Sequence, residues 1–172
     1  MKKGDVVVAK VLPSDVGQDY FHLFGLEIDF NIDLSRLKTA YRALQRETHP
    51  DRYVNASDQE KRIAMSYSAL VNEAYACLTD DLKRAAYCLS LSGEDVDFEH
   101  NTAMAPDFLM QQMDWRERLA MPKAHDDATA EIQAARRDLL DAISAGFDDQ
   151  ADLKQLSDQV RQLAFLNKLC AE

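Results

Sequence analysis

The chain has 172 residues, 47% of them hydrophobic, so it can bury a core and is long enough for one ordinary domain or two small ones. With only five Gly and four Pro, its composition favours helices. The net charge of −10 is uneven, because residues 1–93 carry 12 basic and 13 acidic side chains whereas residues 94–172 carry 8 and 17. Such an acidic second part excludes a protein that wraps nucleic acid, because the phosphates would be repelled.

The three cysteines are odd in number, widely spaced and without a CxxC pair, which argues against a disulfide framework and a zinc site. We expect buried thiols in a reducing compartment at Cys77, Cys88 and Cys170. No apolar stretch approaches the roughly 20 residues of a membrane span. The apolar run at residues 6–8 is too short for a signal-peptide core. The sequence therefore predicts a soluble cytoplasmic protein that needs neither metal nor cofactor and binds no membrane.

Residues 1–18 show no helical period and can form either a short edge strand or a tail. Asp19 can cap a short helix that Gly25 ends. The next predicted helix starts after Asp33 and reaches about Thr48. Its apolar side chains share one face: Leu34, Leu37, Tyr41 and Leu44.

A capping box, in which Ser57 is the N-cap and Glu60 reaches back to it, predicts the start of a helix that ends near Thr79. Its apolar side chains repeat at helical spacing. A loop of about eight residues joins this helix to the one before it, which predicts an antiparallel helical hairpin. A shorter helix over about 82–91 follows and stops at Gly93.

The polar segment 94–105 is typical of a linker. Three helices are predicted after it: one from Pro106 to before Pro122, one over about 126–145 closed by Gly146, and one over about 150–169. The last is capped by Asp148 or Asp149. The sequence thus predicts an all-α protein whose parts are an N-terminal extension (1–18), a hairpin domain with flanking short helices (19–93), a linker (94–105) and a three-helix bundle (106–172).

The tip of the predicted hairpin carries the sequence His49-Pro50-Asp51. An X-Pro-Asp sequence is common in turns of many proteins, so the tripeptide alone says little about function. The preceding helix, however, places basic side chains at spacings of four on a stripe away from its apolar face, and Arg52 follows the turn. The stripe consists of Lys38, Arg42 and Arg46. Although exposed cations can simply keep a helix soluble, this is the basic face of an acidic protein and favours an acidic protein partner.

With the run from Asn72 to Asp80 and with Arg84 and Tyr87, this pattern resembles the J-domain family over about residues 19–93. The resemblance implies that the basic face and the turn dock on a DnaK-type chaperone and speed its ATP hydrolysis. It implies this role for Lys38, Arg42, Arg46, His49, Pro50, Asp51 and Arg52. Thr48 departs from the family, which often has an aromatic residue at that position.

The helix that begins at Pro106 has two apolar faces. Phe108, Trp115 and Leu119 fall on one face, which we assign to the bundle core. The opposite face should then be exposed and consists of Leu109, Met110 and Met113, edged by Asp114 and Glu117. Phe165 points away from the apolar face of the last helix and is also expected to be exposed. The alternative is that both surfaces are buried against the first domain or against each other.

The segments 108–117 and 160–166 sharpen the resemblance to the HscB-type co-chaperones, which then covers nearly the whole chain after residue 18. This resemblance implies that the chain binds the iron–sulfur scaffold protein IscU and delivers it to the chaperone HscA. It implies scaffold binding by Leu109, Met110, Met113, Asp114, Glu117 and Phe165. Met121 stands where the family usually has an acidic residue, and no cysteine precedes Cys77 that could form the N-terminal zinc module of some eukaryotic relatives.

Three functions compete on this sequence. The first is an adaptor that activates the chaperone with one end and carries a client with the other. The second is a small hydrolase that uses His49 and Asp51 as acid and base, but no Ser or Cys nucleophile is adjacent and no Gly-rich phosphate loop is present. The third is a J protein that recruits a general DnaK chaperone to a different client.

Overall fold

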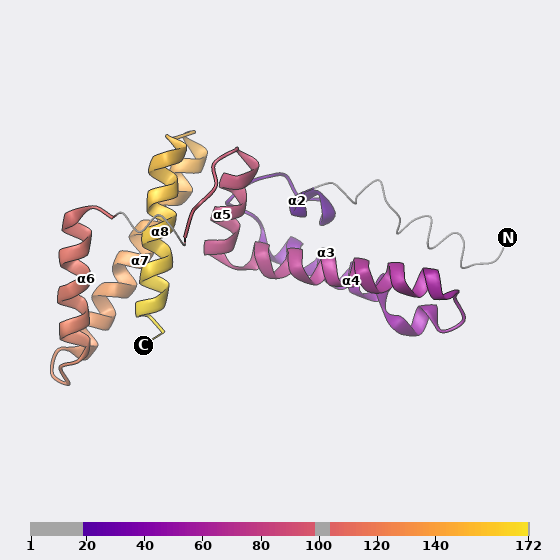
Figure 1. Ribbon diagram of the computed structural model, residues 1–172, viewed down its shortest axis with the longest axis horizontal. Helices are drawn as coiled ribbons and strands as arrows, with labels where there is room; N and C mark the ends of the chain where they lie inside the picture. Colours follow the sequence, from indigo (N-terminus) through magenta and orange to yellow (C-terminus); the bar gives the residue numbers. More distant parts are fainter. Residues whose placement is uncertain (1–18, 99–103, 172) are drawn as a thin grey trace. The chain divides into compact units, whose positions relative to one another are not determined.

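The computed structural model describes residues 19–98 and 104–171, and the predicted extension at residues 1–18 lies outside them. The chain divides into two compact units, one ending at Arg84 and the other beginning at Ala85. Every regular element in the described ranges is a helix (Figure 1), which confirms the all-α prediction. The helices are α2 (Tyr20–Leu23), α3 (Leu34–Thr48), the 3₁₀ helix η1 (Pro50–Tyr53), α4 (Asp58–Thr79), α5 (Asp81–Leu91), α6 (Pro106–Leu119), α7 (His125–Asp148) and α8 (Leu153–Leu169). The division falls within α5, and the predicted boundaries at residues 93 and 105 stay predictions.

The helix ends of the first unit follow the predicted caps. The Asp19 carboxylate accepts a hydrogen bond from the backbone N–H of His22, and Gly25 ends this turn with a φ of +64°, a conformation that glycine adopts without strain. The Asp33 carboxylate caps α3. At α4, Ser57 and Glu60 form both hydrogen bonds of the capping box.

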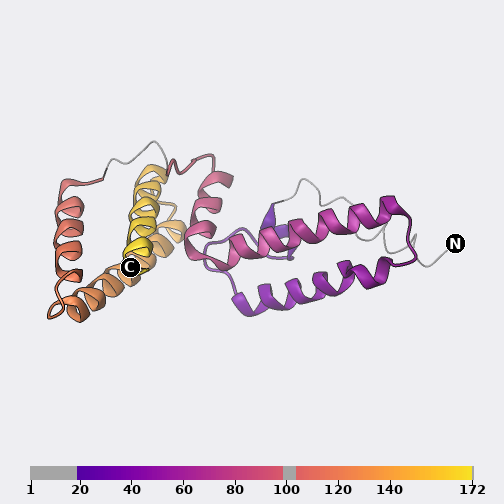
Figure 2. The ribbon, with the colours of Figure 1, turned by 60° about the horizontal axis from the view of Figure 1, so that its bottom comes forward.

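Helices α3 and α4 lie side by side as an antiparallel pair (Figure 2), as the sequence predicts. The rings of Tyr41 and Tyr75 stack with centroids 3.9 Å apart, and the Tyr41 hydroxyl donates to Asn72 Oδ1 at 3.0 Å. Leu37 is buried in the interface as predicted, whereas Leu34 is about half exposed. Leu34 is the first residue of α3, and a helical side chain leans toward the N-terminal end, where no earlier turn exists to cover it.

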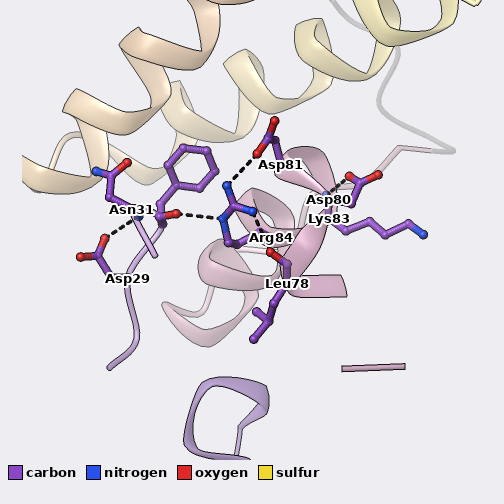
Figure 3. A network of polar contacts seen from close by, with 8 residues as sticks. Asp29, Asn31, Leu78, Asp80, Asp81, Lys83 and Arg84 are labelled. Atoms are coloured by element: carbon purple, nitrogen blue, oxygen red, sulfur yellow. Dashed lines mark hydrogen bonds and ion pairs between the residues drawn. The ribbon is translucent and has the colours of Figure 1, made fainter. Parts of the chain in front are cut away.

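Arg84 ties the start of α5 to the loop before α3 (Figure 3). Its buried guanidinium donates to the carbonyl oxygens of Phe30 and Leu78 at 2.8 and 2.7 Å, pairs with Asp81 at 2.7 Å, and lies over the Phe30 ring. A buried charge is tolerated when a counter-charge and hydrogen bonds satisfy it. Arg84 therefore has a structural role in the first unit.

In the second unit, α6, α7 and α8 pack around one apolar cluster as the predicted three-helix bundle. Trp115 and Ile132 are buried with Leu166 and Leu169, and Phe108 and Leu119 pack against them. The assignment of the Phe108, Trp115 and Leu119 face to the core is therefore confirmed.

The connection between α7 and α8 differs from the prediction. Gly146 lies inside α7, which continues to Asp148, and α8 begins at Leu153 with Asp152 as its N-cap. The positive φ of the turn, 52°, belongs to Gln150. Gly146 serves close packing instead, because a Cβ atom there would lie 2.5 Å from Leu156 Cδ2 of α8.

None of the helices in the described ranges is long and apolar enough to span a bilayer. Cys88 is buried and Cys77 is half-buried, and burial raises the pKa of the Cys77 thiol. The expectation of a buried thiol is wrong for Cys170, which is exposed because it lies at the C-terminal cap of α8.

Candidate functional site

The predicted basic stripe lies on the solvent side of α3. Lys38, Arg42 and Arg46 are all exposed, whereas Leu37 and Tyr41 on the other side face α4. Arg46 Nε donates to the backbone carbonyl of Arg42 at 3.2 Å, which holds the Arg46 side chain along its own helix. The stripe therefore presents several positive charges to a partner without a core role for any of them.

The stripe leads into a tight turn at His49. Because Pro50 follows, His49 leaves the helical region (φ −59°, ψ 132°), and the chain re-forms a single 3₁₀ turn over Pro50–Tyr53. The backbone N–H of Arg52 donates to the His49 carbonyl at 3.0 Å and closes this turn. Pro50 and Arg52 are exposed, so the turn presents most of its surface to solvent.

Tyr53 fastens the turn to the hairpin, and Thr48 is buried at the end of α3 beside it. Tyr53 is 5% exposed, and its hydroxyl donates to the carbonyl of Glu47 at 3.2 Å. Burial raises the pKa of the Tyr53 hydroxyl, which keeps the donor proton in place. Thr48 is also buried and donates to the Leu44 carbonyl at 3.0 Å, so its small side chain is satisfied within α3.

The side chains of His49 and Asp51 point outward, 59% and 87% exposed. His49 Nδ1 lies 3.3 Å from the backbone N of Asp51 and 3.5 Å from its carboxylate Oδ2. When Nδ1 accepts from the N–H, Nε2 carries the ring proton and is the donor available to a partner. The Asp51 carboxylate can accept two hydrogen bonds, as an arginine of a partner protein requires.

A second exposed surface lies on α6 and is formed by Leu109, Met110 and Met113. These side chains are 44%, 64% and 73% exposed, as predicted from the two-faced helix. Methionine side chains adapt their shape to a partner, so this exposed apolar cluster is a candidate surface for binding another protein.

Asp114 and Glu117 edge this surface and are exposed. Asp114 is also held by Arg118, whose guanidinium lies 3.2 Å from its carboxylate and forms two hydrogen bonds of 2.7 and 2.6 Å to Glu131 of α7. The hydrogen bonds that Arg118 donates to Glu131 lower the pKa of the Glu131 carboxyl and raise the pKa of the Arg118 guanidinium. Sequence reasoning missed Arg118, because its partner Glu131 lies on another helix.

The expectation that Phe165 is exposed is wrong. It is half-buried against the bundle core, where its ring meets Phe108 edge-on with centroids 6.1 Å apart. The guanidinium of Arg116 covers the other part of the ring at 5.1 Å from the centroid. A side chain that points away from Leu156 on α8 still reaches the shared core, because α6 and α7 both pack against α8 around the cluster.

Across residues 19–98 and 104–171, no three His, Cys, Asp or Glu side chains come together in a way that could hold a metal ion. The arrangement offers charge, hydrogen bonds and apolar area to other proteins. Its two surfaces belong to different units and have different chemistry.

Comparisons with known proteins match both units. Residues 19–87 match the family model described as DnaJ domain, and residues 104–172 match the one described as HSCB C-terminal oligomerisation domain. The Co-chaperone protein HscB homolog of Bordetella petrii is 44% identical over 160 residues, which cover 90% of this chain and 93% of that protein. Among solved structures, Chaperone HscB from Vibrio cholerae superposes with a TM-score of 0.79 at 35% identity over 90% of this chain and 94% of that one. The human co-chaperone protein HscB superposes with a TM-score of 0.84 at 28% identity over 90% and 79%.

Proposed function

Because the chain belongs to the HscB family of co-chaperones and carries a J domain, we propose that it stimulates the ATPase of the DnaK-type chaperone HscA and delivers the iron–sulfur scaffold protein IscU to it. The family is one of co-chaperones and not of enzymes. The observation that carries the proposal is the outward-facing His49-Pro50-Asp51 turn beside three exposed cations of α3. In this role the protein works in the cytoplasm and aids iron–sulfur cluster assembly and transfer.

On the chaperone side, the interface consists of Lys38, Arg42, Arg46, His49, Pro50, Asp51 and Arg52. The stripe attracts an acidic groove of the ATPase and orients the approach. Asp51 then accepts hydrogen bonds from an arginine of HscA, while Pro50 keeps the carboxylate and the imidazole in fixed positions. No bond is broken by these residues, and they act by stabilising the hydrolysis-competent state of the chaperone.

On the scaffold side, the interface consists of Leu109, Met110, Met113, Asp114, Glu117 and Phe165. Its exposed apolar centre with two carboxylates at the edge fits an apolar patch of IscU that basic side chains surround. Phe165 contributes through the part of its ring that the core leaves accessible, and Arg116 has to move for a partner to reach that ring.

The ATPase rate of HscA tests the proposal when it is measured with and without this protein, each with and without IscU. We expect stimulation by this protein alone and a further, more than additive increase when IscU is present. Stimulation that IscU leaves unchanged would contradict delivery of this client.

The variant His49→Gln, made in the full chain, tests what the turn contributes to stimulation. We expect it to abolish stimulation while the helical circular dichroism stays unchanged, because the side chain is exposed and has no role in the core. His125→Gln is the matched control, since His125 is a similarly exposed histidine at the start of α7. Full stimulation by His49→Gln would remove this function from the turn.

The alternative is a J protein that recruits a general DnaK chaperone to a different client. Met110→Ala/Met113→Ala tests the client, alone and combined with Phe165→Ala, because the two methionines have no partners in the bundle core. Loss of IscU binding with ATPase stimulation by the variant alone preserved favours the first function. Ile28→Ala, another exposed apolar residue, should bind IscU normally.

A further inference from the structure

An apolar groove of about 520 Å³ lies beside the His49-Pro50-Asp51 turn, and Pro50 is the lining residue that the proposed chaperone interface also uses. Its lining runs from the end of α3 through η1 along one face of α4. The apolar lining residues include Pro50, Tyr53, Val54, Ala64 and Met65.

Two of these side chains are unusually exposed for their type. Val54 is 65% exposed and Met65 is 69% exposed, although both belong to a concave surface. Burying such side chains removes apolar surface from water, so an apolar segment that fits the groove gains free energy on binding. Among the described residues that line the groove, Lys61 carries a charge, which favours an occupant with a carboxylate next to its apolar part.

The chain itself supplies a segment with these properties. Residues 6–12 read Val-Val-Val-Ala-Lys-Val-Leu, and Asp5 stands directly before them. Among the 18 residues that precede the described structure, this is the most apolar stretch, and neither proposed interface uses it.

The first described helix, α2, packs against α4, the helix that lines most of the groove. Asp19 is followed by Tyr20, whose hydroxyl donates to Glu73 Oε1 of α4 at 3.0 Å. The neighbour of Glu73 in sequence, Asn72, lines the groove. Helix α2 therefore lies against α4 beside the residue that forms one end of the groove.

The N-terminal extension is long enough to follow the groove. From Asn72 to Lys61 the groove follows eleven residues of α4, which correspond to about 16 Å at 1.5 Å per residue. The eleven residues from Val8 to Asp19 span up to about 36 Å when extended. This reach exceeds the length of the groove along α4.

We propose that the N-terminal segment 5–12 binds in this groove of its own chain, with its valines and Leu12 over Val54 and Met65 and with Asp5 near Lys61. A tethered segment has a high effective concentration, so modest apolar burial is sufficient to keep it bound. The extension thereby covers apolar surface directly beside the turn that is proposed to bind the chaperone.

Methionine oxidation by dilute hydrogen peroxide tests this in the full chain, with each sulfoxide quantified by peptide mass spectrometry. Met65 and Met113 are 69% and 73% exposed in the described structure, so Met113 is a matched internal standard. Because the oxidation rate follows exposure, we expect Met65 to react at least about threefold more slowly than Met113. Val7→Asp/Val8→Asp should bring Met65 to within about twofold of Met113, since two carboxylates do not enter an apolar groove.

Ser14→Asp/Gln18→Asp is the matched control, because it adds the same charge to the same extension outside the apolar run and should leave Met65 protected. Equal oxidation of the two methionines in the wild-type chain overturns the proposal. So does protection of Met65 that persists in Val7→Asp/Val8→Asp, because another occupant then covers the groove. Protection that disappears on dilution of the protein assigns the groove to a second copy of the chain and also overturns it.

Discussion

The turn at the end of the α3–α4 hairpin and the outer face of α6 are both exposed, but they are built in different ways. The turn presents charged groups at fixed positions, because Pro50 restricts its backbone and the buried Tyr53 fastens it to α3. The α6 face presents flexible apolar side chains such as Met110 and Met113 on a regular helix. The first is suited to geometrically specific, charge-dependent recognition, and the second to burying apolar area against a partner that adapts to it.

The largest expected effect comes from replacing one aspartate on each surface and comparing the two losses of binding or activity. Asp51→Asn should reduce chaperone stimulation at least about tenfold, because losing one member of a desolvated charge pair costs about 2–5 kcal/mol. Asp114→Asn should weaken scaffold binding only about two- to threefold, because Asp114 already shares an exposed ion pair with Arg118, and such pairs contribute about 0–1 kcal/mol. ATPase assays and calorimetric titration with IscU measure the two effects, and the comparison breaks if their order is reversed.

The second effect concerns stability and distinguishes the two kinds of apolar residue in the proposed scaffold interface. Phe165→Ala should lower the free energy of unfolding by about 1–3 kcal/mol, because the half-buried ring packs on Phe108 and the bundle core. Met110→Ala should change it by less than about 0.5 kcal/mol, since its side chain is 64% exposed. Urea unfolding measures both, and equal losses would show that Met110 has a packing role.

Raising the salt concentration should weaken binding at the two surfaces to different degrees, and this effect is smaller than the preceding ones. Raising ionic strength from about 50 to about 300 mM should weaken chaperone binding roughly fivefold, because exposed charges are screened over a Debye length of about 10 Å or less. Binding of IscU should change by less than about twofold, since apolar burial dominates there. Binding isotherms at several salt concentrations measure both, and an equal salt dependence would contradict the distinction.

The smallest expected effect is the pH dependence of the Arg118–Glu131 contact in the bundle. The folded-state pKa of Glu131 lies below its ordinary value of 4.5, so the contact contributes stability above that pH and loses it as the pH falls through the lower folded value. Glu131→Gln and Arg118→Gln should therefore both lose less stability than the wild type between about pH 6 and pH 3. Urea midpoints measured across this range test the effect, and unchanged pH dependence in both variants would remove it.

Local chemistry allowed the sequence to predict the first surface well. Asp33 and the Ser57–Glu60 capping box act within one turn of their own helices, and Pro50 acts on the residue beside it. These signals are complete in a few consecutive residues, so the hairpin, its turn and the exposure of the stripe followed from them. The helical spacing of apolar residues, which is also a local signal, identified the two faces of α6.

The tertiary structure decided what depends on a neighbouring helix. Phe165 looked exposed from the periodicity of α8, yet Phe108 and Arg116 of α6 cover much of its ring. Gly146 looked like a helix end, yet it allows α7 and Leu156 of α8 to approach closely. A sequence pattern records which side of its own helix a residue occupies, whereas burial and pairing depend on which other helix arrives at that side, and only the packed chain determines that.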